Sequence, residues 1–134
     1  MANRPLRRGW SYEIGDVIVR GKFNVGATGA VGTIVPGVGN AIKSITRNSA
    51  GNYTIVFKDN FKDFHTAKAW IAFASAGAVM NPALQVKPWS YTPGAAGGAT
   101  MVIQVVTLAS PEVAADAPNG CQIHFEVYAK NSSV

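Results

Sequence analysis

The sequence predicts an all-β protein, an antiparallel β-sandwich or barrel of jelly-roll-like type with an extended N-terminal arm. Three observations lead to this prediction: apolar and polar residues alternate in several segments, turn-forming residues separate those segments, and no segment has a convincing amphipathic-helix period. We expect about six or seven strands. The 134 residues suffice for one domain, which we divide into a basic arm over residues 1–12 and a single β domain over residues 13–134.

The N-terminal third is expected to hold an arm, a strand and a loop. Residues 1–12 contain three arginines and Trp10 and follow neither period, which predicts an extended arm. Apolar residues alternate with Asp, Arg, Lys and Asn over residues 16–25, so we expect a half-buried strand whose alternation is broken by Ile18. Residues 26–39 are rich in Gly, Ala and Val, and we expect a loop there that lies against another surface.

The central segment carries the best hairpin signal of the chain. Residues 41–47 and 53–58 flank Asn-Ser-Ala-Gly-Asn at residues 48–52, a composition typical of a four- or five-residue hairpin connection. Residues 59–64 are expected to turn the chain, and residues 66–74 to resume as a strand, with a helix as the alternative because of their alanines. The apolar residues expected to share a face are Tyr53, Ile55 and Phe57, and then Ala67, Ala69, Ile71 and Phe73.

The C-terminal half is expected to add two long strands. Residues 82–98 form a long connection, inside which residues 84–87 have the pattern of a short edge strand. Residues 101–108 are nearly all apolar, which predicts a strand covered on both faces. The strongest alternation of the chain covers residues 121–130. It places Cys121, Ile123, Phe125, Val127 and Ala129 inward, and Gln122, His124, Glu126, Tyr128 and Lys130 outward.

The residues that could carry catalysis are few and dispersed. His65 and His124 lack a metal-ligand spacing, so we expect both to be surface or hydrogen-bonded histidines. Cys121 is the only cysteine, which excludes an intrachain disulfide and predicts a buried thiol. Asp59 and Asp63, a close pair of acids, are expected to solvate a turn. We therefore expect no enzymatic activity, no cofactor and no metal site.

Charge and hydropathy further narrow the functional class of the protein. The net charge is +5 with only 14% charged residues, and part of the basic excess belongs to the arm, so nucleic acid is not the expected partner. The uncharged segments hold too much Gly, Pro, Ser and Thr for a membrane-spanning helix. The N-terminus has no leader pattern, so we expect folding in a cytoplasm. Residues 32–39 have the glycine spacing of a phosphate loop without its Lys and Ser or Thr, which favours a tight loop.

The aromatic residues divide into core and surface candidates. Trp70 lies within a predicted strand, and we expect it in the core. Trp10 adjoins the basic arm, while Trp89 and Tyr91 lie in a proline-bounded loop. These three are either interface anchors, since aromatic residues and arginine dominate interface centres, or residues that pack locally.

One pattern at the predicted hairpin carries a resemblance. Residues 45–57 read Ile-Thr-Arg-Asn-Ser-Ala-Gly-Asn-Tyr-Thr-Ile-Val-Phe, followed by Phe61 and the strand over residues 65–74. This pattern resembles small virion proteins of tailed bacteriophages, capsid decoration (cement) proteins among them, in which an x-R-x-x-x-G-x-Y-T hairpin precedes a long apolar strand. The resemblance covers the central third of the chain.

The resemblance implies a trimeric β-rich protein that binds the outer surface of a capsid and stabilises contacts between major capsid subunits. Its partners would be the major capsid protein and further copies of itself, and it would be made in the host cytoplasm and end on the capsid exterior. A three-fold assembly would bury the uncharged segments, and the arm would reach neighbouring subunits. The expected interface residues are Arg4, Arg7, Arg8, Trp10, Gly29, Val31, Val35, Trp89 and Tyr91.

Two alternatives remain open from the sequence. The first is a head-fibre or tail-associated module that binds receptors or glycans through exposed aromatic residues such as Trp89 and Tyr91. The second is a single-stranded nucleic-acid-binding protein, which would stack bases on aromatic rings flanked by basic residues. Loss of glycan binding on Trp89→Ala would indicate the first, and a steep salt dependence of oligonucleotide affinity the second.

Overall fold

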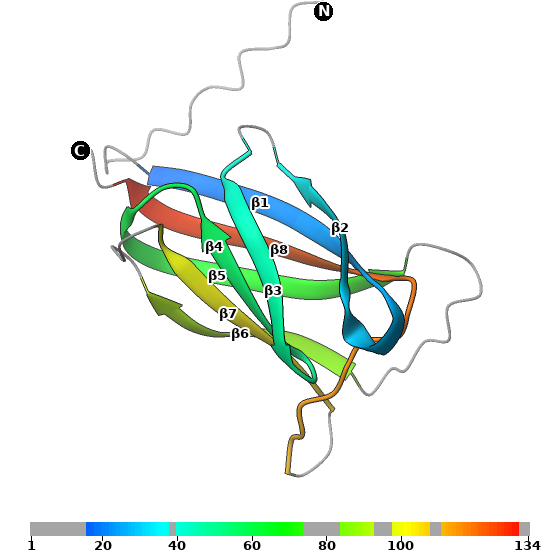
Figure 1. Cartoon of the computed structure of the whole chain (residues 1–134). Coiled ribbons are helices and arrows are strands. Elements are labelled where there is room, and N and C mark those ends of the chain that lie inside the picture. The colour runs from blue at the N-terminus through cyan, green and yellow to red at the C-terminus, as the bar shows by residue number, and fades with distance from the viewer. Residues whose placement is uncertain (1–15, 38–39, 74–83, 93–97, 108–110, 132–134) are drawn as a thin grey trace, which may run out of the picture.

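The computed structural model is a sandwich of two four-stranded antiparallel sheets (Figure 1). It describes residues 16–37, 40–73, 84–92, 98–107 and 111–131. The arm predicted over residues 1–12 therefore lies outside the described residues. The predicted all-β sandwich is confirmed, in the two-sheet layout that jelly rolls also have.

Eight strands and one short 3-10 turn, η1 at Ala27–Gly29, make up the regular structure of the described residues. One sheet, which we call the β8 sheet, has the order β2-β1-β8-β5, with β1 at Asp16–Val25, β2 at Val31–Pro36, β5 at Phe61–Phe73 and β8 at Cys121–Asn131. The other, the β4 sheet, has the order β3-β4-β7-β6, with β3 at Ile42–Ser49, β4 at Asn52–Phe57, β6 at Leu84–Thr92 and β7 at Thr100–Thr107. Figure 1 shows β3 and β4 crossing in front of β1, β8 and β5, so the sheets form two layers.

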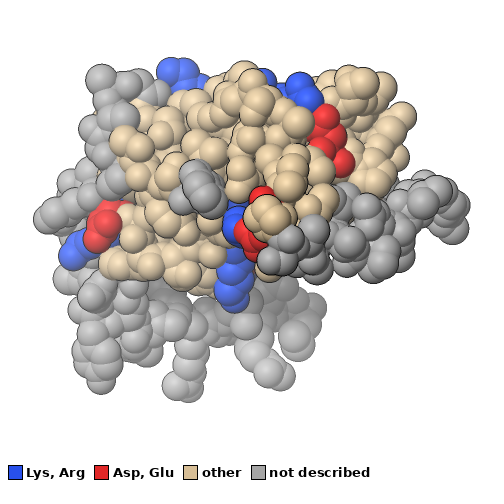
Figure 2. Space-filling view, turned by 90° about the horizontal axis from the view of Figure 1, so that it is seen from below, with Lys and Arg blue, Asp and Glu red and all other residues tan. Residues whose placement is uncertain are grey.

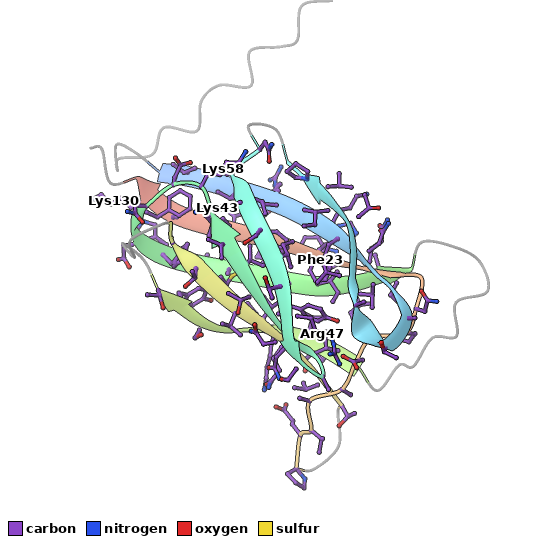
Figure 3. The ribbon with its side chains drawn as sticks, in the orientation of Figure 1. Phe23, Lys43, Arg47, Lys58 and Lys130 are labelled. Carbon is purple, nitrogen blue, oxygen red and sulfur yellow. The ribbon has the colours of Figure 1, made fainter. Side chains whose placement is uncertain are left out.

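The core lies between the inner faces of the two sheets and follows the alternation of the sequence. Phe23 of β1 and Tyr53 of β4 are both fully buried, and their ring centroids lie 5.0 Å apart, which joins one layer to the other. Figure 3 shows the labelled Phe23 pointing into the space between the layers. The inward residues expected for β4 and β8 are confirmed as buried: Tyr53, Ile55, Phe57, Cys121, Ile123, Phe125, Val127 and Ala129.

The loop expected over residues 26–39 is wrong over Val31–Pro36, where the chain forms a strand. After η1 the chain forms β2, which pairs antiparallel with β1. The return is tight because the Gly26 amide donates to the Ala30 carbonyl at 2.8 Å and Gly29 adopts a φ of +73°, which favours glycine. Glycine and Pro36 hid this strand from the sequence pattern, but an edge strand tolerates both.

The β3–β4 hairpin is confirmed, with a shorter connection than predicted. The strands continue to Ser49 and restart at Asn52, so only Ala50 and Gly51 form the turn. Gly51 has a φ of +70°, and the Asn52 side-chain amide donates to the Ser49 hydroxyl at 2.9 Å. These local bonds allow the ladder to run into the polar segment that predicted a longer loop.

The strands β5 and β6 are longer than the sequence predicted. The turn expected over residues 59–64 is partly wrong, because β5 already begins at Phe61, whose side chain is 2% exposed. The helix alternative for the segment after it is wrong, since Ala67, Ala69 and Ile71 pack against the core with the strand period of two. The predicted edge strand is confirmed as β6 at the edge of the β4 sheet, and its register shifts around Pro88.

One end of the sandwich is held by a polar cluster around Asp116. Its carboxylate accepts hydrogen bonds from Arg47 Nε at 3.1 Å and Nη2 at 2.7 Å, and from the Gly51 amide at 2.8 Å. The hydrogen bonds from Arg47 keep the pKa of Asp116 below its usual value. Beside this cluster the buried Tyr53 hydroxyl donates to the Gly29 carbonyl at 2.7 Å, and burial raises the pKa of Tyr53 to about 12. The hairpin, η1 and the segment before β8 are thereby joined.

Candidate binding surfaces

Uncharged side chains fill two complete cross-strand rows on the outer face of the β4 sheet. Cross-strand pairing aligns Ser44, Val56, Thr100 and Thr92 in one row, and Thr46, Thr54, Val102 and Ser90 in the next. Asn52 and Gln104 pair in a third row, where the Gln104 amide donates to Asn52 at 3.0 Å. We call these ten residues the uncharged face.

Charged groups are sparse elsewhere on the molecule as well. Figure 2 shows one face on which Lys, Arg, Asp and Glu form a few separate patches in a surface made mostly of other residues. Lys87, which follows Gln104 in the third row on the β4 sheet, forms an ion pair with Glu112. The uncharged face therefore presents hydroxyl, amide and β-branched side chains, whose burial costs less than that of charged groups.

The outer face of the β8 sheet has a different character. Pairing of all four strands aligns Val35 of β2, Lys22 of β1, His124 of β8 and Trp70 of β5 in one row. The adjacent row holds Arg20, Glu126 and Lys68, and Tyr128 follows on β8. We call these eight residues the aromatic–basic surface.

Two stacked rings form the centre of this surface. The Trp70 and His124 ring centroids lie 5.4 Å apart with an interplanar angle of 19°, and Trp70 remains 44% exposed. Burial, and then the charge of Lys22, lowers the pKa of His124 below its ordinary value. This lowering favours the neutral imidazole, and the lysine and arginine side chains supply the positive charge of this surface.

Glu126 is the one carboxylate of the aromatic–basic surface, and its oxygens are already engaged. Arg20 Nε donates to one oxygen at 2.6 Å, and the Tyr128 hydroxyl donates to the other. The Tyr128 hydrogen bond, followed by the Arg20 hydrogen bond, lowers the pKa of Glu126. The Lys68 ammonium lies 6.0 Å from the centroid of the Tyr128 ring.

Lys22 lies beside a hollow of the surface and takes part in none of the ion pairs found among the described residues. Within that part of the chain, ion pairs join Arg20 to Glu126, Arg47 to Asp116 and Lys87 to Glu112, and none involves Lys22. Lys22 also lines a hollow of about 280 Å³ that opens on the surface between β2 and β5. A cation without a counter-charge at such a hollow can receive an anionic group.

The sequence-predicted interface residues fall into separate places. Val35 is 41% exposed and belongs to the aromatic–basic surface, whereas Tyr91 is 40% exposed on β6 with its ring 5.2 Å from that of Phe64. Gly29 is buried against Asp116, and Val31 is half-buried against the core. The backbone of Trp89 lies in β6, but its side chain is outside the described set, as are the whole of Arg4, Arg7, Arg8 and Trp10.

The prediction that Trp70 lies in the core is wrong, and this error hid the aromatic–basic surface. The alternation that places Ala69 and Ile71 against the core requires Trp70 to face outward. Lys22 and His124 were correctly expected on outward faces, but only the strand order brings them into one row. The period of two in β5 already indicated an outward position for Trp70. The large apolar indole favoured the core prediction instead.

The chemistry of these surfaces is that of binding groups. In the described ranges, no group of three His, Cys, Asp or Glu could hold a metal ion, and no helix is long and apolar enough to cross a membrane. Comparisons of the chain with protein-family models, with curated proteins and with solved structures found no match. The site geometry itself therefore supplies the functional argument.

Proposed function

We propose that this protein is a decoration (cement) protein that binds the exterior of a tailed-bacteriophage capsid and stabilises contacts between major capsid subunits. The observation that carries the proposal is the uncharged face of the β4 sheet. The centres of protein interfaces are depleted of charged residues, because burying an unpaired charge is costly. Ten aligned side chains without a charge supply such a centre on rigid strands.

The resemblance to phage virion proteins supports the same surface. The hairpin that carries it forms β3 and β4, and the outward side chains of Thr46 and Thr54 belong to the middle row of the uncharged face. The rest of the resembling pattern continues into β5, which belongs to the other sheet. The outward residues of this hairpin determine the chemistry of its part of the uncharged face.

The proposed assembly is a homotrimer on the outer capsid surface, made in the host cytoplasm and not acting as an enzyme. The major capsid protein is the partner of the uncharged face. The basic arm with Arg4, Arg7, Arg8 and Trp10 extends over neighbouring subunits, where arginine can pair with carboxylates. Cyclic symmetry would place one uncharged face of each subunit against the capsid.

A pair of matched variants tests the proposal. Thr54→Lys places a charge in the middle of the uncharged face, whereas Thr66→Lys places the same charge on the outer face of the β8 sheet. The assay is co-sedimentation of each purified variant with capsids assembled from the major capsid protein of the same genome. We expect Thr54→Lys to weaken binding by about tenfold or more, because an unpaired lysine must be desolvated at the interface.

The control defines the outcome that overturns the proposal. Thr66→Lys should bind capsids as the unmodified protein does, and circular dichroism should show that both variants keep the β fold. If a folded Thr54→Lys variant binds capsids normally, the uncharged face is not the docking surface. If the unmodified protein fails to sediment with capsids at all, the decoration role is wrong.

A further inference from the structure

The hollow on the aromatic–basic surface has apolar sides and a cation between them. Trp70 stands on β5, and Val35 and Pro36 stand on β2 at the other side of the hollow. Between them lie Lys22 and then His124, which stacks on Trp70, all in one cross-strand row with Val35, and Arg20 also lines the hollow. A ligand that fits these groups has an apolar ring face and an anionic group attached to that ring.

The size of the hollow limits the ligand to a single ring-sized unit. Its volume is about 280 Å³, at or below the lower end of the roughly 300–1,000 Å³ typical of sites for drug-sized ligands. Glycine shapes one rim, because the Gly37 amide donates to the Arg20 carbonyl at 2.8 Å and a Cβ on Gly37 would lie 2.6 Å from that oxygen. Gly37 therefore has no room for a side chain at this rim.

The charge pattern favours a sugar over a nucleic-acid strand. Single-stranded nucleic acids need several stacking rings along a basic track, since each nucleotide brings a phosphate. Here one indole is 44% exposed, and in the adjacent row Arg20 is already paired with the Glu126 carboxylate, so the surface does not offer a series of unpaired cations to successive phosphates. A sugar ring needs one stacking face, and its hydroxyl groups both donate and accept, so mixed polar neighbours suit it.

We propose that this hollow binds a carboxylated sugar unit of an acidic glycan, with the sugar ring on Trp70 and its carboxylate at Lys22. His124 stacks on one face of the indole, and the other face supplies a flat apolar surface to the C–H groups of the ring. The lysine supplies the charge-assisted hydrogen bond that separates an acidic sugar from a neutral one. This activity is independent of capsid docking, which uses the opposite sheet, so either proposal can fail without the other.

Titration calorimetry with tetragalacturonate, a short acidic oligosaccharide, tests the proposal on the purified full chain. We expect binding that Trp70→Ala abolishes and that Lys22→Gln weakens by about tenfold or more, as loss of a charge-assisted hydrogen bond requires. Maltotetraose lacks the carboxylate, so it should bind the unmodified protein no more tightly than it binds Lys22→Gln. A thymidine oligonucleotide should show no saturable binding.

Matched controls separate the site from general effects of charge and folding. Tyr91→Ala removes an aromatic residue whose exposure is similar to that of Trp70, but from the other sheet. Lys58→Gln removes a positive charge from the residue that directly follows β4, at the opposite end of that strand from Tyr53. Figure 3 shows Lys58 well apart from Phe23, the neighbour of Lys22. Both controls should bind tetragalacturonate normally. The proposal is overturned if tetragalacturonate does not bind, if maltotetraose binds equally, if the oligonucleotide binds more tightly, or if Trp70→Ala binds normally.

Discussion

Replacing Tyr53 by phenylalanine tests how the closed end of the sandwich is held. The Tyr53 ring is fully buried, and its hydroxyl donates to the Gly29 carbonyl at 2.7 Å. Tyr53→Phe keeps the ring in the core and removes only this hydrogen bond between β4 and η1. Near neutral pH we expect the free energy of unfolding to fall by about 1–2 kcal/mol, the usual cost of deleting one partner of a buried hydrogen bond.

The same variant has a second signature at alkaline pH. The pKa of Tyr53 is raised from 10.0 to about 12, chiefly by burial. The neutral form is therefore favoured by folding, so its stabilisation is complete below pH 10 and is lost as pH rises through about 12. The full loss is at most about 2.7 kcal/mol, and about half of it falls by pH 11. The stability difference between the two proteins should thus close near pH 11.

Urea unfolding followed by far-ultraviolet circular dichroism measures both effects. The two proteins are compared at pH 7 and at steps up to pH 11, with equal m-values required so that the midpoints report stability. Ionisation of all other groups is common to both proteins and cancels in the difference. The reasoning is refuted if Tyr53→Phe is as stable as the unmodified protein at pH 7, or if their difference stays constant up to pH 11.

The remaining predictions concern packing, the polar cluster and the arm. Gly21→Ala should cost about 1–3 kcal/mol in urea unfolding, because its Cβ would lie 2.7 Å from the Phe125 ring, whereas Gly26→Ala, with no contact under 3.6 Å, should be near neutral. Asp116→Ala should lower the melting temperature at pH 7. The difference in melting temperature should shrink as pH falls through the lowered pKa of Asp116, because the unmodified protein then loses the same ion pair. A difference that stays constant with pH would contradict this. Deleting residues 1–9 should abolish capsid binding and leave the fold intact, and normal binding by the truncated protein would refute the role of the arm.

The sequence predicted the fold best where one face of a strand is buried. In β8 the period of two persists over the whole strand, and every expected inward residue is at most 1% exposed. The sequence pattern did not predict the edge strand β2. This strand contains glycine and proline, which an edge strand tolerates but a central strand does not. Composition predicts a loop there, because the pairing with β1 is a tertiary property that no local pattern contains.

The aromatic–basic surface could be predicted only in part. The outward direction of Lys22 and His124 follows from alternation, and Trp70 would have followed from the same rule. Their meeting in one row depends on the order β2-β1-β8-β5, which joins strands far apart in the chain. The uncharged face likewise needs the pairing of β4 with β7, since neither strand alone shows that its ten residues lie together.

The central claim is that the uncharged face of the β4 sheet binds the capsid while the aromatic–basic surface of the β8 sheet remains open to solvent. Electron cryo-microscopy of capsids decorated with the purified protein tests it most directly, because the two sheets differ in strand order and can be told apart in the density. We predict that β3, β4 and β7 face the major capsid protein and that Trp70 faces outward. A bound protein whose β8 sheet lies against the capsid would contradict the claim.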